Sequence, residues 1–241
     1  MCSRFSLLVF NQLEELQAQF NTHNVIEGMD FKKIYLPTDQ ILVIYRNEIL
    51  NKNEMIKMRW SLIPSYIKDF EQIKKYSLYN ARLESLEEKP SFKNLLNNRR
   101  CLIPVDIFYE YKSEGKTKEQ YGFSLNPEST FGIAGLWDIW IHPQTNQKIY
   151  SCTMITTVGN EIIAPIHEKN RMPVILNPEL YEEWLNPTID FSHFKNQLLP
   201  YDANKMKVEK RTDNTKLPQT PKIKLANKDD LENNQPSLFS S

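Results

Sequence analysis

Short apolar segments rich in β-branched and aromatic residues follow one another closely in the middle of the chain. Polar residues, glycine or proline separate them, as is typical of strands joined by short turns. The segments are Cys101–Val105, Phe108–Tyr111, Gln120–Leu125, Phe131–Trp137 and Tyr150–Thr157. This pattern predicts the strands of an antiparallel or mixed sheet.

The segments on either side of this region mix further strands with short helices. On the N-terminal side the pattern predicts a strand at Phe5–Phe10, a helix over Asn11–Phe20, a loop and strand over residues 36–45, a hairpin over residues 48–60 around Asn51–Asn53, and helical stretches at Asn80–Ser85 and Phe92–Asn98. On the C-terminal side it predicts a turn entering a helix at Val158–Ile163, a strand at Met172–Leu176 and a short helix at Pro178–Leu185. Because strands and helices interleave without the spacing of βαβ units, we expect an α+β fold.

The chain turns polar and charged after Pro221. Such a composition cannot bury enough apolar surface to offset the entropy of ordering, so it predicts a flexible tail. We therefore expect one compact domain over residues 1–222 and a C-terminal tail over residues 223–241.

Amino-acid composition argues against several classes of protein but does not indicate a particular function. The formal charge of the 241 residues is zero, so bulk positive charge gives no reason to expect nucleic-acid binding, although a local basic groove stays open. Three cysteines without regular spacing do not form a disulfide framework, and neither CxxC nor HxxxH occurs. We expect no metal or other cofactor. No apolar run approaches the length of a membrane span and no signal peptide is visible, so the cytoplasm is the expected compartment.

Cys2 gives the N-terminus a distinctive chemistry. Removal of Met1 is favoured when the next side chain is small, and it would leave Cys2 with a free α-amine beside its thiol. Both groups have a reactive fraction near neutral pH. The amine attacks an aldehyde to give an imine, and the thiol then closes on the same carbon to give a thiazolidine. The alternatives are an accidental cysteine in a frayed terminus, or lipidation, which the absence of a preceding apolar region disfavours.

Six motifs in order then match a known family. They are Met-Cys-Ser-Arg-Phe at 1–5, Arg-Trp-Ser-Leu-Ile-Pro at 59–64, Asn-Ala-Arg-Leu-Glu at 80–84, Arg-Cys-Leu-Ile-Pro-Val-Asp-Ile-Phe-Tyr-Glu-Tyr at 100–111, Ala-Gly-Leu-Trp at 134–137, and Ile-His followed by Arg-Met-Pro-Val-Ile-Leu within 166–176. The chain resembles the SOS-response-associated peptidase family, whose members shield abasic sites in single-stranded DNA by covalent attachment. The resemblance implies a compact α+β domain with a mixed, largely antiparallel β-barrel-like core flanked by helices. It also implies a positively charged groove leading to the N-terminal cysteine.

The resemblance assigns a catalytic group. Cys2 would crosslink to the ring-opened sugar aldehyde, Asn80 would orient the sugar or the amine, and Glu110 and His167 would move protons. These residue types suit the chemistry, since imine formation needs an acid to release water and a base to accept a proton. Without the resemblance, Glu110 would be a solvent-facing strand residue and His167 a structural histidine.

The resemblance also implies a DNA-binding set. Arg82 would hold a neighbouring phosphate with its planar donor fork. Arg4, Arg59 and Arg171 are further candidates for the phosphate-binding groove, and Trp60 would either stack beside the lesion or pack in the core. Three departures from the family pattern bear on these roles: Ser3 and Ser61 replace common glycines, and three residues rather than a shorter spacer separate His167 from Arg171.

The tail carries a second resemblance. Gln235-Pro236-Ser237-Leu238-Phe239 is similar to peptides that bind the bacterial replication sliding clamp, with Leu238 and Phe239 entering an apolar pocket and Gln235 a polar one. The alternative is a polar tail that happens to end in two apolar residues.

Three functions therefore stand side by side. The first is a DNA-repair protein that senses abasic sites and forms a covalent thiazolidine through Cys2, with lyase-like reversal by the same acid and base. The second is a cysteine peptidase, self-processing in its simplest form, in which Cys2 is the nucleophile and His167 the base. The third is a non-covalent DNA binder in which Cys2 is dispensable. For the first we expect a monomer, associated with the nucleoid when bound to DNA.

Overall fold

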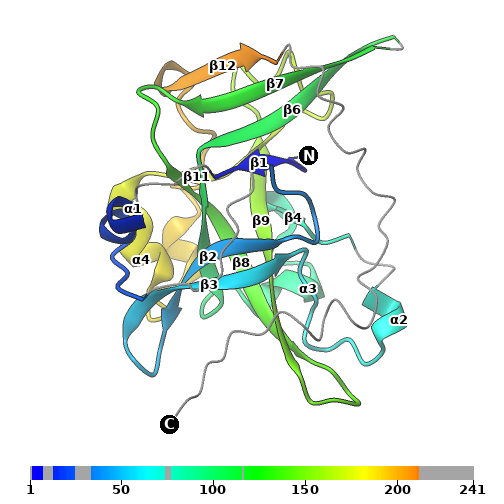
Figure 1. Ribbon diagram of the computed structural model, residues 1–241, viewed down its shortest axis with the longest axis vertical. Helices are drawn as coiled ribbons and strands as arrows, with labels where there is room; N and C mark the ends of the chain where they lie inside the picture. The colour runs from blue at the N-terminus through cyan, green and yellow to red at the C-terminus, as the bar shows by residue number, and fades with distance from the viewer. Residues whose placement is uncertain (1, 8–12, 25–33, 74–76, 116, 212–241) are drawn as a thin grey trace.

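The computed structural model describes residues 2–7, 13–24, 34–73, 77–115 and 117–211 (Figure 1). Its strands are β1 (Phe5–Ser6), β2 (Gln40–Asn47), β3 (Lys52–Trp60), β4 (Asn80–Arg82), β5 (Arg100–Val105), β6 (Ile107–Glu114), β7 (Thr117–Leu125), β8 (Phe131–Ile141), β9 (Lys148–Val158), β10 (Arg171–Pro173), β11 (Ile175–Leu176) and β12 (Met206–Lys210). Its helices are α1 (Leu13–Gln19), α2 (Phe70–Ile73), α3 (Pro90–Lys93) and α4 (Tyr181–Leu185), with 3-10 turns η1 (Leu83–Ser85), η2 (Pro178–Leu180), η3 (Phe191–Phe194) and η4 (Ala203–Lys205).

Five strands close into a mixed barrel. They follow the order β9, β3, β2, β5 and β8, and β8 pairs with β9 to complete the circle. Four of the five junctions are antiparallel, whereas β3 and β9 run parallel, with Arg59 opposite Ser151 and Trp60 opposite Cys152. Closure leaves the barrel strands with no unpaired edge, and it confirms the α+β fold with a largely antiparallel, barrel-like core.

A second, four-stranded sheet lies against the barrel in the order β1, β6, β7 and β12 (Figure 1, top). Phe108 of β6 stacks on Phe123 of β7 at 5.1 Å and meets Phe131 of the barrel edge-on at 6.4 Å. These aromatic contacts join the two sheets into one core. The N-terminal strand β1 pairs with β6, with Phe5 opposite Phe108.

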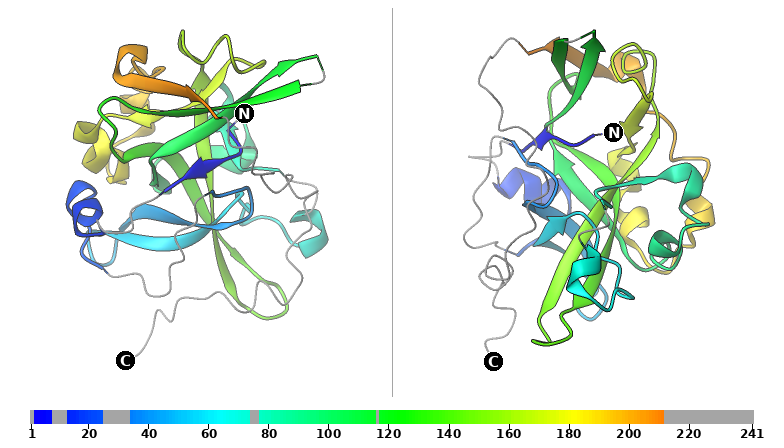
Figure 2. Two further views of the ribbon diagram at one scale, coloured as in Figure 1. Left: turned by 45° about the horizontal axis from the view of Figure 1, so that its top comes forward. Right: turned by 90° about the vertical axis from the view of Figure 1, so that its right-hand side faces the viewer.

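Short helices cover the sides of the barrel, as the two further views show (Figure 2). The end of α1 packs on α4, where the rings of Phe20 and Tyr181 stack at 5.0 Å. Arg100 of β5 extends beneath α4 and donates hydrogen bonds to the carbonyl oxygens of Leu96, Trp184, Asn186 and Ile189. This buried guanidinium satisfies carbonyl groups that the short helices leave open.

The structure changes several of the expected elements. Asn80–Arg82 is a strand parallel to β9 and not the start of a helix; only Leu83–Ser85 makes a helical turn. The α-helix expected over Phe92–Asn98 ends at Lys93, and Val158–Ile163 leads into hydrogen-bonded turns. The hairpin turn lies at residues 48–51, slightly before its expected place, and the strand expected at Met172–Leu176 is divided at Val174.

Of the strand expected at Phe5–Phe10, the described residues hold only Phe5–Ser6. The other expected strands are present, as is the helix over Pro178–Leu185, in the form of η2 followed by α4. Residues 8–12 of the first predicted strand and helix lie outside the described residues, as does the whole tail from residue 212.

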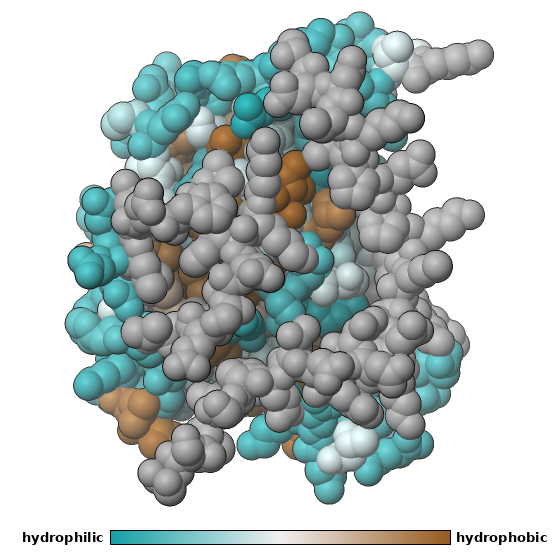
Figure 3. Space-filling view, in the orientation of Figure 1, coloured by the Kyte–Doolittle hydropathy of each residue, from teal (hydrophilic) through white to brown (hydrophobic). Residues whose placement is uncertain are grey.

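Among the coloured residues on the molecular face in Figure 3, hydrophilic ones predominate. Hydrophobic residues gather at its lower left, over the hairpin that joins β2 and β3, where Ile49 and Leu50 are exposed. No helix in the described ranges is long and apolar enough to cross a membrane.

Candidate active site beneath the N-terminal strand

Cys2 lies between the two sheets with only 1% of its surface exposed. The residues before β1 continue beside β6, where the Tyr109 N–H donates to the Arg4 carbonyl oxygen at 2.9 Å. The Cys2 thiol donates to the same oxygen at 3.5 Å. These contacts hold Cys2 against the sheet, three residues before β1 begins.

Asn80 fixes Cys2 from the side of the barrel. Its Nδ2 donates to the Cys2 carbonyl oxygen at 2.6 Å. Its backbone is placed by parallel pairing of β4 with β9, which sets Asn80 opposite Met154. The other amide atom, Oδ1, is buried and has no hydrogen-bond partner among the described residues. Since an unsatisfied buried acceptor is costly, Oδ1 is an acceptor available to a group outside the described residues.

Glu110 and His167 form a buried pair next to Cys2. Glu110 comes from β6 and His167 from the turns that follow β9; Oε2 and Nε2 are 3.3 Å apart, and both side chains are less than a tenth exposed. His167 Nδ1 accepts a hydrogen bond from the Arg171 N–H at 3.2 Å. A neutral His167 therefore carries its proton on Nε2 and donates it toward Glu110.

Burial shifts the pKa of each of these groups toward its neutral form. It raises the pKa of Glu110 to about 7 and lowers the pKa of His167 to about 4. The pKa of the Cys2 thiol is raised by burial and then by the negative charge of Glu110. Near neutral pH the site accordingly holds a neutral imidazole, a neutral thiol and a carboxyl group present in both protonation states.

The longer spacer between His167 and Arg171 forms a compact turn. The Asn170 N–H donates to the His167 carbonyl oxygen at 2.7 Å, and Asn170 adopts a φ of +46°. The Asn170 carbonyl oxygen in turn accepts from the Gly159 N–H at 3.0 Å. The extra residues are accommodated within this turn, and His167 still contacts Glu110.

The residues expected to bind DNA divide into two groups. Arg82 is exposed at the end of β4, and Arg4 lies beside Cys2 and donates to the Tyr111 hydroxyl. Arg59 is buried and donates to the Ser61 carbonyl oxygen at 2.6 Å, whereas Arg171 is buried and binds the carboxylate of Glu84 through both terminal nitrogens. The phosphate contacts of Arg59 and Arg171 stay predictions. The burial of both side chains and their hydrogen bonds within the protein do not favour such contacts.

Trp60 is fully buried, which favours packing in the core over stacking beside the lesion. Its Nε1–H donates to the Tyr79 carbonyl oxygen at 2.9 Å, and its ring meets Phe5 edge-on at 5.1 Å. Its contribution to the site is to support the strand that carries Asn80. Gln235, Leu238 and Phe239 lie outside the described residues, so the clamp-binding peptide stays a prediction.

Two tyrosines near the site were not anticipated. The pKa of Tyr79 is raised by burial and by the charges of Cys2 and Glu110, which places its phenol within electrostatic reach of both. Tyr111 receives the hydrogen bond from Arg4. In the sequence, Tyr79 directly precedes Asn80 and Tyr111 directly follows Glu110, and this adjacency could have indicated that both tyrosines lie near the site.

Ser61 adopts a φ of +152°, in a region that favours glycine. We expect Ser61→Gly to raise the free energy of unfolding by about 1 kcal/mol, because glycine removes the steric cost of this conformation. Urea denaturation measures the change. The matched control is Ser124→Gly in β7, where the same exchange in regular strand should destabilise the protein by about 0.5–1 kcal/mol. Equal destabilisation by both variants would show that Ser61 is unstrained.

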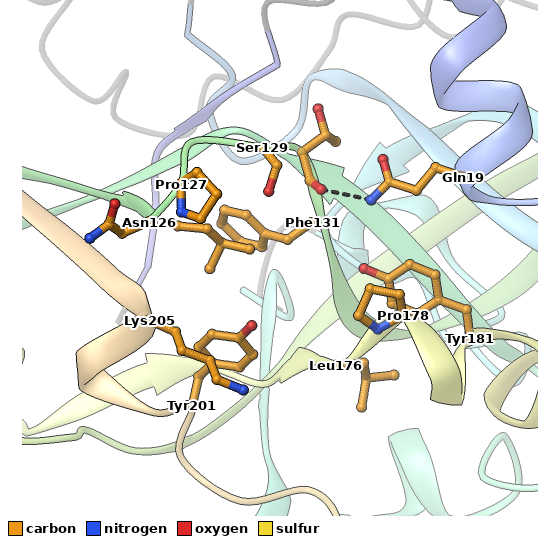
Figure 4. A pocket seen from close by; sticks show the side chains of 12 residues that line it. Gln19, Asn126, Pro127, Ser129, Phe131, Leu176, Pro178, Tyr181, Tyr201 and Lys205 are labelled. Carbon is orange, nitrogen blue, oxygen red and sulfur yellow. Dashed lines mark hydrogen bonds between the residues drawn. The ribbon is translucent and has the colours of Figure 1, made fainter.

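A cavity of about 270 Å³ lies away from these residues (Figure 4). Tyr181, Tyr201, Phe131 and Lys205 are among the side chains around it, and the Gln19 side chain donates to the Thr130 carbonyl oxygen at its rim. None of the predicted catalytic residues lines it. The candidate site around Cys2 is therefore separate from this cavity.

The fold and site define an α+β barrel protein with a buried N-terminal cysteine facing an amide and a carboxyl–imidazole pair. Residues 1–214 match the sequence model of the family described as SOS response associated peptidase (SRAP), and the chain belongs to this family.

Individual relatives agree with this assignment. The chain is 41% identical over 210 residues to "Abasic site processing protein YoqW" of Bacillus subtilis, which covers 86% of this chain and 90% of that protein. It is 30% identical over 154 residues to "Abasic site processing protein HMCES" of Gallus gallus; the match covers 55% of this chain and 45% of that protein. A crystal structure of a protein from Bacteroides thetaiotaomicron has a TM-score of 0.80 at 26% identity, covering 88% of this chain and 93% of that one. Another, from Bordetella bronchiseptica, has a TM-score of 0.74 at 26% identity, covering 87% and 99%.

Proposed function

We propose that this protein processes abasic sites in single-stranded DNA. After removal of Met1, the α-amine and thiol of Cys2 would capture the sugar aldehyde as a thiazolidine and so shield the lesion by a covalent DNA–protein crosslink. The names of the relatives support the substrate class. The observation that carries the chemistry is the Glu110–His167 pair beside Cys2, with a Glu110 pKa of about 7.

The first half of the reaction forms the imine. The neutral α-amine adds to the aldehyde carbon, and proton transfer gives a neutral carbinolamine. The carboxyl form of Glu110 then protonates the hydroxyl group, which leaves as water, and the nitrogen lone pair forms the iminium bond. Because Oε2 accepts from His167 Nε2, the proton that Glu110 gives to the substrate comes from Oε1.

The second half closes the ring. Glu110, now a carboxylate, accepts the thiol proton as Sγ of Cys2 adds to the iminium carbon. The π electrons of the iminium bond return to nitrogen, and a neutral five-membered ring results. The sum of both halves is protein plus aldehyde giving adduct plus one water, with Glu110 returned to its carboxyl form. A group with a pKa near neutrality suits both steps, since it must act first as acid and then as base.

Asn80 would hold the reacting residue in place. Its Nδ2 binds the Cys2 carbonyl oxygen, and its unpartnered Oδ1 is an acceptor for the liberated amine or for a sugar hydroxyl. Positioning of this kind lowers the entropic part of the barrier. From the iminium, proton abstraction by the same carboxylate would give strand cleavage by β-elimination, which is the lyase-like reaction of this site.

The peptidase alternative receives less support from the geometry. A cysteine nucleophile works as the thiolate, yet burial and Glu110 raise the pKa of the Cys2 thiol. His167 Nε2, which would have to accept the thiol proton, carries a proton and faces Glu110. The aldehyde reaction needs only a neutral thiol and a neutral amine.

The test is denaturing electrophoresis of the full chain after incubation with a single-stranded oligonucleotide that carries one abasic site. The expected result is a heat-stable shifted band whose mass is the sum of both reactants less one water. An oligonucleotide with a tetrahydrofuran analogue, which has no aldehyde, should give no band. A protein with an uncleaved N-terminal extension keeps the Cys2 thiol but not its free amine, and should also give none. If the wild-type protein with Met1 removed gives no band, the proposal fails.

A further inference from the structure

The outer face of the four-stranded sheet carries two arginines packed on two tyrosines. Arg4 donates to the Tyr111 hydroxyl, and its guanidinium carbon is 5.3 Å from the centre of that ring. The guanidinium carbon of Arg211, the residue that follows β12, is 5.7 Å from the ring centre of Tyr109. We call Arg4, Tyr109, Tyr111 and Arg211 the arginine–tyrosine strip.

Strand register places the strip on one face of the sheet. Tyr109 is opposite Gly122 and Tyr111 is opposite Gln120, and the Arg211 N–H donates to the Gln120 carbonyl oxygen at 2.8 Å. Residues that pair directly project to the same side of a sheet, whereas their neighbours along the strand project to the other. Glu110 and Phe108 accordingly face the barrel, and the strip faces away from it.

Gly122 makes the contact between Arg211 and Tyr109 possible. A Cβ atom at this position would lie 3.3 Å from Nε of Arg211 and 3.3 Å from Cε1 of Tyr109. Such distances are tighter than ordinary packing allows. Because Gly122 has no side chain, the Arg211 side chain can cross the sheet at this position and place its guanidinium over the Tyr109 ring.

The strip is continuous with the proposed reaction site. The Arg4 carbonyl oxygen receives hydrogen bonds from both the Cys2 thiol and the Tyr109 N–H. The two guanidinium groups lie over β6, on Tyr111 and Tyr109, which are two residues apart on that strand. Two residues of a strand span about 7 Å. The strip therefore matches the rise over two nucleotides of one strand of duplex DNA, which is about 3.4 Å for each phosphate.

We propose that the arginine–tyrosine strip binds the backbone of single-stranded DNA beside the lesion, with Arg211 as a phosphate contact. This deepens the proposed function and rests on it for the position of the lesion. Guanidinium groups bind phosphate through a planar fork, and packing against an aromatic ring keeps that fork oriented. Arg211 and Tyr111 are partly exposed, so Arg211 can offer its charge to the nucleic-acid backbone and Tyr111 a ring on which a base stacks, whereas Arg4 and Tyr109 are buried and support them.

The experiment measures non-covalent binding by fluorescence anisotropy. The probe is a labelled single-stranded oligonucleotide with a central tetrahydrofuran analogue and several nucleotides on each side, which cannot crosslink. Arg211→Ala should weaken binding about 5- to 10-fold and reduce the slope of log affinity against log salt by about 0.7. Arg211→Lys keeps the charge, so it should keep the salt slope and lose only part of the affinity. With only one flanking nucleotide on each side, Arg211→Ala should have little effect.

Lys210→Ala is the matched control. It removes one positive charge from the adjacent residue, which pairs with Tyr121 on the opposite face and binds Glu119. It should leave affinity and salt slope unchanged. Unchanged binding by Arg211→Ala, or an equal effect of Lys210→Ala, would overturn the proposal. If Arg211→Ala lowers the melting temperature, Arg211→Lys distinguishes the two roles of Arg211. A phosphate contact predicts that Arg211→Lys keeps the salt slope of the wild-type protein. A purely structural role predicts that Arg211→Lys loses both affinity and salt slope.

Two further outcomes separate this inference from the proposed function. If wild-type protein gives no heat-stable band with the abasic oligonucleotide but Arg211→Ala still weakens binding, the crosslink is wrong and the strip stands. If the band forms and Arg211→Ala changes neither affinity nor slope, the crosslink stands and the strip is wrong. Displacement of the probe by polyglutamate as effectively as by unlabelled DNA would indicate a general anion surface and also overturn the proposal.

Discussion

Cys2→Ala is expected to eliminate the heat-stable DNA–protein product while leaving imine formation intact. Alanine is small, so Met1 is still removed and a free α-amine remains, held near Glu110 by the Asn80 contact to the carbonyl oxygen of residue 2. This amine forms an imine with the abasic aldehyde, but no thiol is present to close the ring. The imine hydrolyses when the sample is heated.

The measurement compares the two proteins with and without borohydride. Wild-type protein should give the band under both conditions, whereas Cys2→Ala should give it only when borohydride reduces the imine. Cys2→Ser is the matched control, because it keeps the size and polarity of the side chain while replacing the thiol by a weaker nucleophile; it should behave like Cys2→Ala. A heat-stable band from Cys2→Ala without reductant would show that another residue makes the crosslink.

The second large effect is expected from Glu110→Gln. Glutamine can accept the hydrogen bond from His167 Nε2 but cannot exchange a proton, so both the loss of water and ring closure lose their proton carrier. General acid–base catalysis contributes about 100- to 10,000-fold, and we expect the rate of crosslinking to fall by at least about 100-fold. The wild-type rate should peak near pH 7, the Glu110 pKa, since the carboxyl form is needed first and the carboxylate second. The variant should lose this peak.

Stability separates this catalytic role from a structural one. Folding raises the Glu110 pKa from 4.5 to about 7, so the stabilisation due to this group is complete below about pH 4.5 and is lost as pH rises through 7. A neutral glutamine avoids the cost of a buried carboxylate. Glu110→Gln should therefore be more stable than wild type near pH 8, by up to about 3 kcal/mol, and similar to it near pH 5. Urea denaturation at both pH values checks this, and a variant that is both slower and less stable near pH 8 would contradict the assignment.

The sequence was most informative where local pattern and structure coincide. The strands between residues 101 and 157 follow from their β-branched and aromatic composition, and the mixed, barrel-like core follows from the family resemblance. The motif order also brought together Cys2, Asn80, Glu110 and His167, which the fold places next to one another. Their roles stay predictions until the variants are measured.

The features that the local sequence pattern did not predict have a common physical cause, which is contact between segments far apart in the chain. Asn80–Arg82 has the composition of a helix start, but its backbone is satisfied by β9. The carboxylate of Glu84 binds Arg171 on both terminal nitrogens, a contact that the sequence pattern does not indicate, and the phosphate contact of Arg171 stays a prediction. The sequence pattern gives no signal for Arg211, because its contact with Tyr109 forms only when β12 pairs with β7.

The pairing of β1 with β6 has a consequence for the order of events during synthesis. Cys2 is buried only when β6 and Asn80 are in place, and the ribosome makes more than a hundred residues before β6 is complete. At about 5–20 residues per second, this leaves the nascent N-terminus accessible for roughly 5–20 s. An aminopeptidase that removes Met1 works on exposed chain ends, so its opportunity falls within this interval. Co-translational processing would thus decide how many molecules carry the aminothiol before the barrel closes over it.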